Sequence, residues 1–259
     1  MRRRPKNPFQ RKGMQPRQVS FGRASFAVAD DKDTFWDRFD AGTWEVGTLS
    51  AIERLVRPGM VVIDIGAWVG PISLTAAALG ATVIAVEPDA RAFELLDVNI
   101  GANPSLKGRI TPINKAAHVE KTRIHLASPK KMGDSMGSVL AVGRGRQQWE
   151  ADTVTPAEIA ALAGDADRIL VKIDIEGGEY ALLPALGPLL GPATVAALVA
   201  FHPRLMQGAG RSPADIEVAT ANATAALSEF DARTLDLGEP SISVTANSTV
   251  LFERRQRGR

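Results

Sequence analysis

The most constraining feature of this sequence is an alternation, from residue 61 onward, of short apolar runs with longer helical patterns. Such an alternation is typical of a mostly parallel sheet whose connecting helices cover its faces. No apolar run reaches the roughly 20 residues that a membrane-spanning helix needs. We therefore predict an α/β fold with strands at residues 61–65, 82–86, 110–114, 169–173 and 195–201.

The segments between these strands carry signals for helix starts. Asp89 is placed to cap the helix that follows it, and Ser212 followed by Pro213 is a common start of another helix. Two weaker strand patterns follow the last helix and close the domain. The predicted helices are 71–79, 89–99, 177–186 and 213–228, and the two weaker strands are 232–236 and 248–252.

Two segments depart from the regular pattern. Residues 117–150 alternate like a strand, become rich in Gly, Ser and basic residues, and then alternate again, which predicts a hairpin with a loop. Residues 20–57 predict a helix packed ahead of the first strand. With 259 residues, we expect a single domain at 20–253 between a disordered basic tail at 1–19 and a basic tail at 254–259.

Composition excludes several kinds of site. The chain has no cysteine, which excludes disulfides, thiolate metal sites and a cysteine nucleophile, and its three histidines leave little capacity for metals. The basic N-terminus lacks the apolar region of a signal peptide, so we expect a cytoplasmic protein. The formal charge of +2 combines basic ends with an acidic middle. Basic ends suit nucleic acid, but short terminal charge runs are more often only solvated.

The segment VVIDIGAWVG at 61–70 predicts a ligand cradle. An apolar strand ends in Asp64, a tight turn runs from Gly66 to Gly70, and a helix follows at once. Glu87 ends the next strand, where a carboxylate in such a fold binds the two ribose hydroxyls of a nucleoside. Both acids lie at carboxyl ends of strands, where open α/β sheets bind ligands.

The composition of this turn distinguishes between nucleoside cofactors. A dinucleotide fingerprint needs a middle glycine that GAWVG lacks, and a P-loop needs a lysine that is absent after Gly70. NAD and ATP are therefore disfavoured. The position of Asp64 two residues before the turn suits a nucleoside that carries a zwitterionic amino acid. This description fits S-adenosylmethionine.

The sequence resembles the FkbM-like family of S-adenosylmethionine-dependent methyltransferases. The matching segments are DIGAWVGPISL at 64–74, AVEPDARAFELLDVNI at 85–100 and LVKIDIEGGEYALL at 170–183, with lesser matches at 113–117 and 133–138. The chain departs from the family at Trp68, where the family usually has Asn. Backbone contacts from the turn do not depend on that side chain.

The resemblance implies that the domain at 20–253 has a Rossmann-like class I methyltransferase fold, with a mostly parallel central sheet and helices on both faces. It also implies O-methylation of a hydroxyl group on a sugar or a secondary metabolite, hence a small-molecule or glycan acceptor. The cofactor-binding residues that the resemblance implies are Glu45, which precedes the matched segments, and Asp64, Gly66, Ala67, Trp68, Gly70, Glu87, Pro88, Asn114, Ala116 and Asp174.

Candidate catalytic residues lie after the fourth and fifth predicted strands. Asp174 is expected near the methyl group and the acceptor, while Glu176 caps or orients the following helix. His202 follows the next strand, and with an ordinary pKa of about 6.5 it would serve as general base at neutral pH; Asp174 is the alternative base. Asp174 and His202 are only two candidate metal ligands, so no metal is predicted.

The loop at 129–148 is expected to close over the acceptor, because it is long and inserted beside the cleft. Ser135, Met136, Ser138 and His202 are then the expected substrate contacts, whereas His118 and His125 are expected at the surface. Two other functions stay open. One is a nucleic-acid methyltransferase that uses its basic tails, and the other is a non-catalytic cofactor-binding interaction protein.

Overall fold

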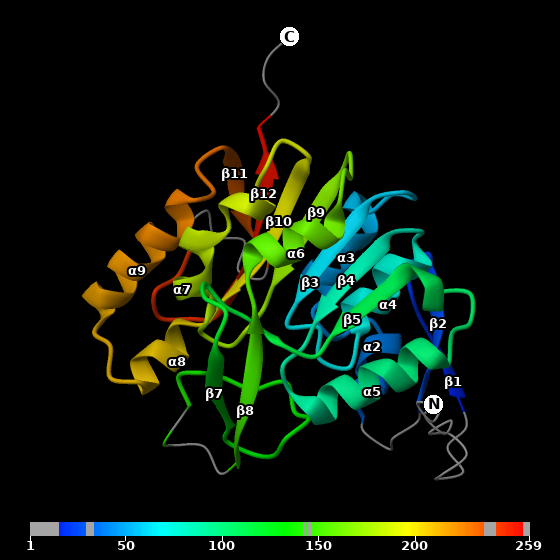
Figure 1. The fold of residues 1–259 in the computed structure, drawn as a ribbon, viewed down its shortest axis with the longest axis horizontal. Helices are drawn as coiled ribbons and strands as arrows, with labels where there is room; N and C mark the ends of the chain where they lie inside the picture. Colours follow the sequence, from blue (N-terminus) through cyan, green and yellow to red (C-terminus); the bar gives the residue numbers. More distant parts are fainter. Residues whose placement is uncertain (1–15, 30–33, 142, 144–146, 236–241, 256–259) are drawn as a thin grey trace.

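A seven-stranded, mostly parallel sheet forms the centre of the protein (Figure 1). The structure is a computed structural model that describes residues 16–29, 34–141, 143, 147–235 and 242–255. The strand order is β11-β12-β10-β9-β3-β4-β5, and only β12 runs antiparallel to its neighbours. The strands are β3 (Val61–Ile65), β4 (Thr82–Val86), β5 (Ile110–Ile113), β9 (Ile169–Ile173), β10 (Thr194–Phe201), β11 (Phe230–Thr234) and β12 (Ser248–Arg254).

This strand order confirms the predicted fold class. From β3 the chain proceeds outward through β4 to β5, and later strands β9 and β10 fill the other side of β3. The direction of winding therefore reverses between β3 and β9. In open α/β sheets this reversal creates a crevice at the carboxyl ends of the strands.

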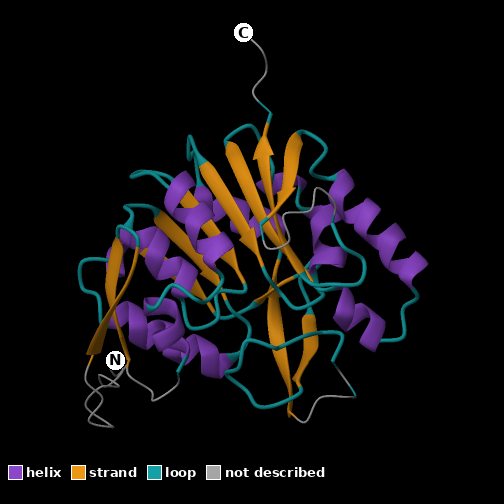
Figure 2. Ribbon diagram, turned by 180° about the vertical axis from the view of Figure 1, so that it is seen from behind, coloured by secondary structure: helices purple, strands orange, loops and turns teal. Residues whose placement is uncertain are grey.

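Helices and two separate apolar cores cover the two faces of the sheet (Figure 2). One core lies under α2 (Phe35–Asp40), α3 (Val46–Leu55), α4 (Pro71–Ala78) and α5 (Ala90–Gly101). The other lies under α6 (Pro156–Ala163), α7 (Glu179–Leu182), α8 (Pro203–Gly208) and α9 (Pro213–Ala225). Strand side chains alternate between the cores, as Val62 and Ile63 do. Among the described helices, none has the length and apolar character needed to cross a membrane.

The N-terminal part differs from the prediction. Strands β1 (Pro16–Phe21) and β2 (Ala24–Ala29) form an antiparallel hairpin, so residues 16–19 belong to the folded domain and not to a tail. Buried Asn99 and Asn103 fix this hairpin to α5, because their side-chain oxygens accept hydrogen bonds from the backbone N–H groups of Ala29 and Ala27, each at 2.8 Å. The predicted tail residues 1–15 lie outside the described residues.

Two other boundaries need correction. The helix predicted at 177–186 is broken, since α7 ends at Leu182 and a 3-10 turn containing Pro184 follows. The C-terminal tail begins later than residue 254. Arg254 ends β12, and its guanidinium donates to the carbonyls of Thr194 and Leu190 and lies over the ring of Phe230.

The predicted hairpin within 117–150 consists of β7 (Arg123–Ser128) and β8 (Gln147–Val154), which pair antiparallel. A short strand, β6 (Ala116–Ala117), joins the edge of β8. The hairpin projects from the end of the sheet opposite to the one where β12 ends (Figure 1). Because β12 is antiparallel to β10, this end carries the carboxyl ends of the parallel strands. The insertion therefore lies beside the crevice.

The contact between the hairpin β1–β2 and α5 provides a test of the fold. Asn103→Ala leaves the backbone N–H and C=O of Ala27 without the side-chain partners that they now have. We expect the free energy of unfolding to fall by roughly 1–3 kcal/mol, as measured by urea denaturation. Exposed Asn222 on α9 serves as the control, and Asn222→Ala should stay within about 0.5 kcal/mol of the parent. Equal effects of the two substitutions would contradict the anchoring role.

Candidate active site

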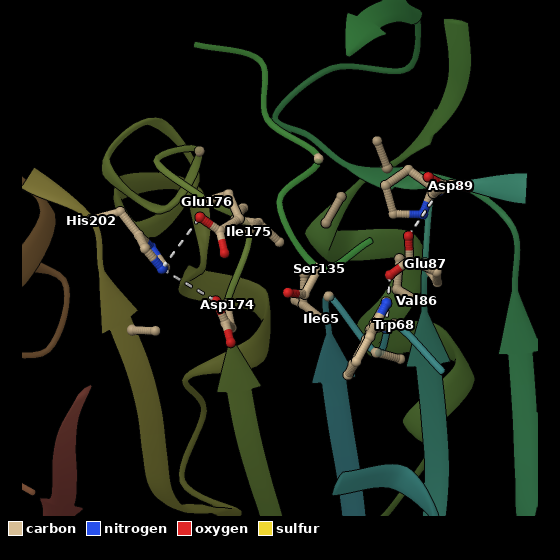
Figure 3. A pocket seen from close by; sticks show the side chains of 18 of the residues that line it. Ile65, Trp68, Val86, Glu87, Asp89, Ser135, Asp174, Ile175, Glu176 and His202 are labelled. Carbon is tan, nitrogen blue, oxygen red and sulfur yellow. Dashed lines mark hydrogen bonds and ion pairs between the residues drawn. The ribbon is translucent and has the colours of Figure 1, made fainter. Parts of the chain in front are cut away.

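A cavity of about 610 Å³ opens at the carboxyl ends of β3, β4, β9 and β10. Its size is typical of sites for small molecules and cofactors. Figure 3 shows two polar groups on opposite sides of it, with Glu87 and Asp89 after β4 on one side and Asp174, Glu176 and His202 after β9 and β10 on the other. The sheet thus places the predicted cofactor carboxylate and the predicted catalytic residues around one space.

The glycine turn after β3 is held by the protein itself. The N–H groups of Gly66 and Ala67 donate to the carbonyl of Val86 at 2.9 and 3.0 Å. Gly66 has a φ of +82°, and a Cβ at this position would lie 1.8 Å from the carbonyl oxygen of Asp174. Gly66 lines the cavity, as expected for a residue of the glycine turn. The absence of a side chain at Gly66 also makes room for the backbone of the neighbouring strand end.

Glu87 is a buried carboxylate at the cavity wall. Its two oxygens accept hydrogen bonds from the backbone N–H groups of Trp68 and Asp89, each at 2.8 Å. Each oxygen accepts one such bond and has a second lone pair. Burial raises the pKa of Glu87 to about 7, although these hydrogen bonds oppose the rise. The carboxylate is therefore oriented and poorly solvated, which suits it to accept hydrogen bonds from a bound ligand.

Lys172 is a central residue of the site that the sequence interpretation missed. Its ammonium donates to the carbonyl of Gly66 at 2.9 Å and lies 3.4 Å from Asp64 and 3.6 Å from Asp174. Burial disfavours its charge, but the surrounding carboxylates, above all Asp64, outweigh burial and raise its pKa. The available signal was the alternation in the segment KID, which places Lys172 and Asp174 on the same side of β9.

His202 is surrounded by carboxylates. The buried carboxylate of Glu179 accepts hydrogen bonds from the backbone N–H of His202 at 2.8 Å and from its Nδ1 at 3.2 Å. Nε2 lies 3.5 Å from Asp174 and 3.7 Å from Glu176. Burial alone would lower the pKa of His202, but Glu179 and then the other two carboxylates raise it to about 10. The expectation of an ordinary pKa near 6.5 is therefore wrong.

Glu176 is held in an uncommon backbone conformation. Its φ is +51°, and the hydroxyl of buried Ser138 donates to its carbonyl oxygen. Among the described residues, the other non-glycine positions with positive φ are Glu45 and Trp68. All three line the cavity. Backbone strain of this kind costs about 1–3 kcal/mol per residue and is concentrated at functional sites.

The loop after β7 contacts the glycine turn through Trp68. The indole Nε1 of Trp68 donates to the carbonyl of Gly133 at 2.9 Å, and the N–H of Gly133 donates to Asp89 at 2.7 Å. The Trp68 ring packs edge-on against Phe35, with 4.5 Å between ring centroids. Ser135 follows in the same loop and lines the cavity (Figure 3). The side chain that replaces the family's Asn thus connects this loop to the turn.

The structure distributes the remaining candidates in two groups. The cavity lining includes Glu45, Ala67, Pro88 and Ala116, together with His118 and His125, which we expected at the surface; His125 is exposed there. Other candidates lie outside the lining and support it from behind. They are Asp64, which pairs with Lys172 and accepts from Ser73; Gly70, which begins α4; Asn114, which donates to the carbonyl of Glu87; Ser138; and Met136.

The placement of Met136 and Ser138 differs from their expected role as substrate contacts. Neither residue lines the cavity, and Ser138 is fully buried, with its hydroxyl hydrogen-bonded to the turn that carries Glu176. Part of the predicted loop, residues 142 and 144–146, lies outside the described residues.

Comparison with protein families identifies the domain. Residues 64–217 match the family described as the methyltransferase FkbM domain. The chain belongs to this family. The match includes both polar sides of the cavity, from Asp64 through Glu87 and Asp174 to His202. No curated protein matches the chain.

Solved structures resemble this FkbM methyltransferase only distantly. A SAM-dependent methyltransferase from Agrobacterium tumefaciens has 12% sequence identity and a TM-score of 0.47, over 93% of this chain and 70% of the other. A precorrin-6y C5,15-methyltransferase from Geobacter metallireducens has 13% identity and a TM-score of 0.42, over 89% of this chain and 94% of the other. These similarities carry no information about the acceptor.

The packing of Gly66 predicts a substitution effect that is separable from backbone strain. Gly66→Ala forces a methyl group against the carbonyl of Asp174, whereas Gly59 has a similar φ of +85° and open space within 4 Å of where a Cβ would lie. We expect Gly59→Ala to lower the free energy of unfolding by about 1 kcal/mol, because only the left-handed backbone is strained. Gly66→Ala should lower it by at least about 2 kcal/mol more, because the strand ends must separate. Urea denaturation measures both, and equal losses would show that the close approach to Asp174 has no energetic consequence.

Proposed function

We propose that this FkbM methyltransferase uses S-adenosylmethionine to methylate a hydroxyl group on a sugar or a secondary metabolite. The observation that carries the proposal is the buried carboxylate of Glu87, which the backbone of the glycine turn orients at the wall of a cavity large enough for a nucleoside. Its free lone pairs suit the paired hydroxyls of a ribose. When bound, S-adenosylmethionine supplies an activated methyl group.

The residues around the cavity fit the parts of this cofactor. Apolar side chains, including Pro88, Ala116 and Leu126, line the cavity on the side of Glu87 and suit the faces of a purine base. Trp44 and Glu45 line the cavity from the segment before α3. The charged groups Lys172, Asp174 and Glu45 suit the opposite charges of an amino-acid moiety, because ion pairs need both signs close together.

The requirements of a methyl transfer indicate which side of the cavity binds the acceptor. The protein has to hold a hydroxyl group near the methyl donor and exclude water. Asp174, Glu176 and His202 surround the space opposite to Glu87, and all three line it. We assign the acceptor hydroxyl to this side. Ser135 in the loop that covers the cavity is the proposed contact from above.

The proposal is tested by calorimetric titration of the full chain with S-adenosylmethionine, followed by transfer assays with a labelled methyl group on sugar and polyketide hydroxyls. If the chain binds S-adenosylmethionine but transfers no methyl group to any hydroxyl, the proposed reaction is contradicted and the protein is a cofactor-binding protein without this activity. Absence of binding would contradict the proposal as a whole. A nucleic-acid acceptor predicts transfer to RNA or DNA that falls steeply with salt, because binding then releases counterions.

Glu87→Gln tests the cofactor contact. Burial raises the pKa of Glu87 to about 7, so a neutral side chain of the same shape is compatible with the fold. We expect affinity for S-adenosylmethionine to fall by at least about tenfold, because hydrogen bonds to a charged group contribute roughly 1.5–3 kcal/mol each. Glu94→Gln, an exposed substitution on α5, is the control and should leave the affinity unchanged. An unchanged affinity in folded Glu87→Gln would contradict the assignment.

The raised pKa of Glu87 also predicts a pH dependence. The ionised carboxylate accepts both ligand hydroxyls, whereas the protonated form loses part of this capacity. Protonation in the free protein therefore weakens binding as the pH falls below about 7. The other charged groups near Glu87 are Asp89 and Lys172, and both are retained in Glu87→Gln.

The measurement is the ratio of the affinities of the parent protein and Glu87→Gln for S-adenosylmethionine. This ratio should be constant above about pH 8 and decrease towards one below about pH 6. Titrations that are common to both proteins, including those of the ligand, cancel in the ratio. A ratio independent of pH would mean that Glu87 does not change its protonation on binding.

A further inference from the structure

We infer that Asp174, Glu176 and His202 form a binding site for one divalent metal cation, which the sequence interpretation did not predict. One potential ligand atom from each residue lies within 4.8 Å of the others. Asp174 and Glu176 follow β9, and His202 follows β10, its parallel neighbour in the sheet. Glu176 is the third ligand, and it lies on a left-handed turn beside Asp174 and His202, the two candidates that the sequence had indicated.

The orientation of His202 is the second observation that points to a ligand. Nδ1 is engaged with Glu179, a carboxylate with no exposed surface that also accepts from the N–H of Gly177 at 2.8 Å. Nε2 is therefore the ring nitrogen that faces the cavity (Figure 3). The side chain of His202 is 9% exposed, and its Nε2 lies between the carboxylates of Asp174 and Glu176, at 3.5 and 3.7 Å. A histidine whose second nitrogen is held by a carboxylate is the usual arrangement behind a metal ligand.

The charges around Nε2 favour a cation. Asp174, Glu176 and Glu179 converge on His202, while the nearest cation, Lys172, faces the other oxygen of Asp174. Asp174 Oδ1 is thus left on the side of the histidine. Three carboxylates therefore face one imidazole on this side of the cavity.

The ligand set selects among metals. Carboxylate oxygens suit Mg²⁺, Ca²⁺ and Mn²⁺, whereas imidazole nitrogen suits later transition metals. Two carboxylates with one imidazole favour Mn²⁺, which accepts both donor types. Three protein ligands leave further positions for water or an acceptor oxygen at the cavity. The position of this metal beside the acceptor hydroxyl rests on the proposed function, but the binding site itself does not.

Electron paramagnetic resonance of the full chain titrated with Mn²⁺, without S-adenosylmethionine, tests the inference. Free Mn²⁺ has a sharp signal that is lost on binding, so the measurement gives stoichiometry and affinity. We expect one bound Mn²⁺ per chain. Asp174→Asn and Glu176→Gln should each weaken binding by at least about tenfold, and Glu179→Gln by about 10–100-fold, because it releases the histidine. Glu94→Gln is the matched control and should bind as the parent does.

Pulsed measurements on the parent protein make the test independent of whether the variants fold. A nitrogen coupling from the imidazole of His202 is expected on bound Mn²⁺. Absence of tight binding by the parent, absence of this coupling, or equal binding by all variants would each overturn the inference. Separate calorimetry with S-adenosylmethionine distinguishes the two hypotheses: cofactor binding without Mn²⁺ binding removes only the metal site, and the reverse result removes only the proposed function.

Discussion

The site depends on one buried ammonium group. Lys172 lies opposite Asp64 in the register of β9 and β3, and it also binds the carbonyl of Gly66 and approaches Asp174. One side chain thereby connects two strands, the glycine turn and the acceptor side of the cavity. Buried charges are tolerated only when they are paired, and loss of one partner leaves an uncompensated charge. The position where the winding of the sheet reverses is thus held by electrostatic pairing as well as by backbone hydrogen bonds.

Around the Lys172–Asp64 pair, residues behind the cavity stabilise the structure, whereas residues at the cavity surface are available to a ligand. Behind the cavity, Asp64, Asn114 and Ser138 bind other parts of the protein. At the cavity surface, residues with raised pKa values or left-handed backbone are exposed to a ligand, as Glu87 and Glu176 are. The residues behind the cavity hold those at its surface in conformations that would otherwise be unfavourable. Several residues that matched the family pattern therefore support the site without facing it.

The sequence predicts the elements of the sheet well because their signals are local. Apolar runs end at glycines or acids, and the capping positions of Asp89 and Ser212 are those predicted. The hairpin β1–β2 was missed because Asn99 and Asn103, which anchor it, lie 70 and 76 residues away in the sequence. A similar limit applies at the site. The change in the pKa of His202 requires Glu179, 23 residues earlier, and nothing in the local sequence reveals that contact.

Trp68 joins two parts of the site, the carboxylate of Glu87 and the loop after β7. Its backbone N–H holds Glu87, and its indole holds Gly133 in the loop over the cavity. A single residue therefore connects the loop after β7 to the carboxylate of Glu87. Because the same residue orients Glu87, the position of this loop and the orientation of the carboxylate are coupled through Trp68.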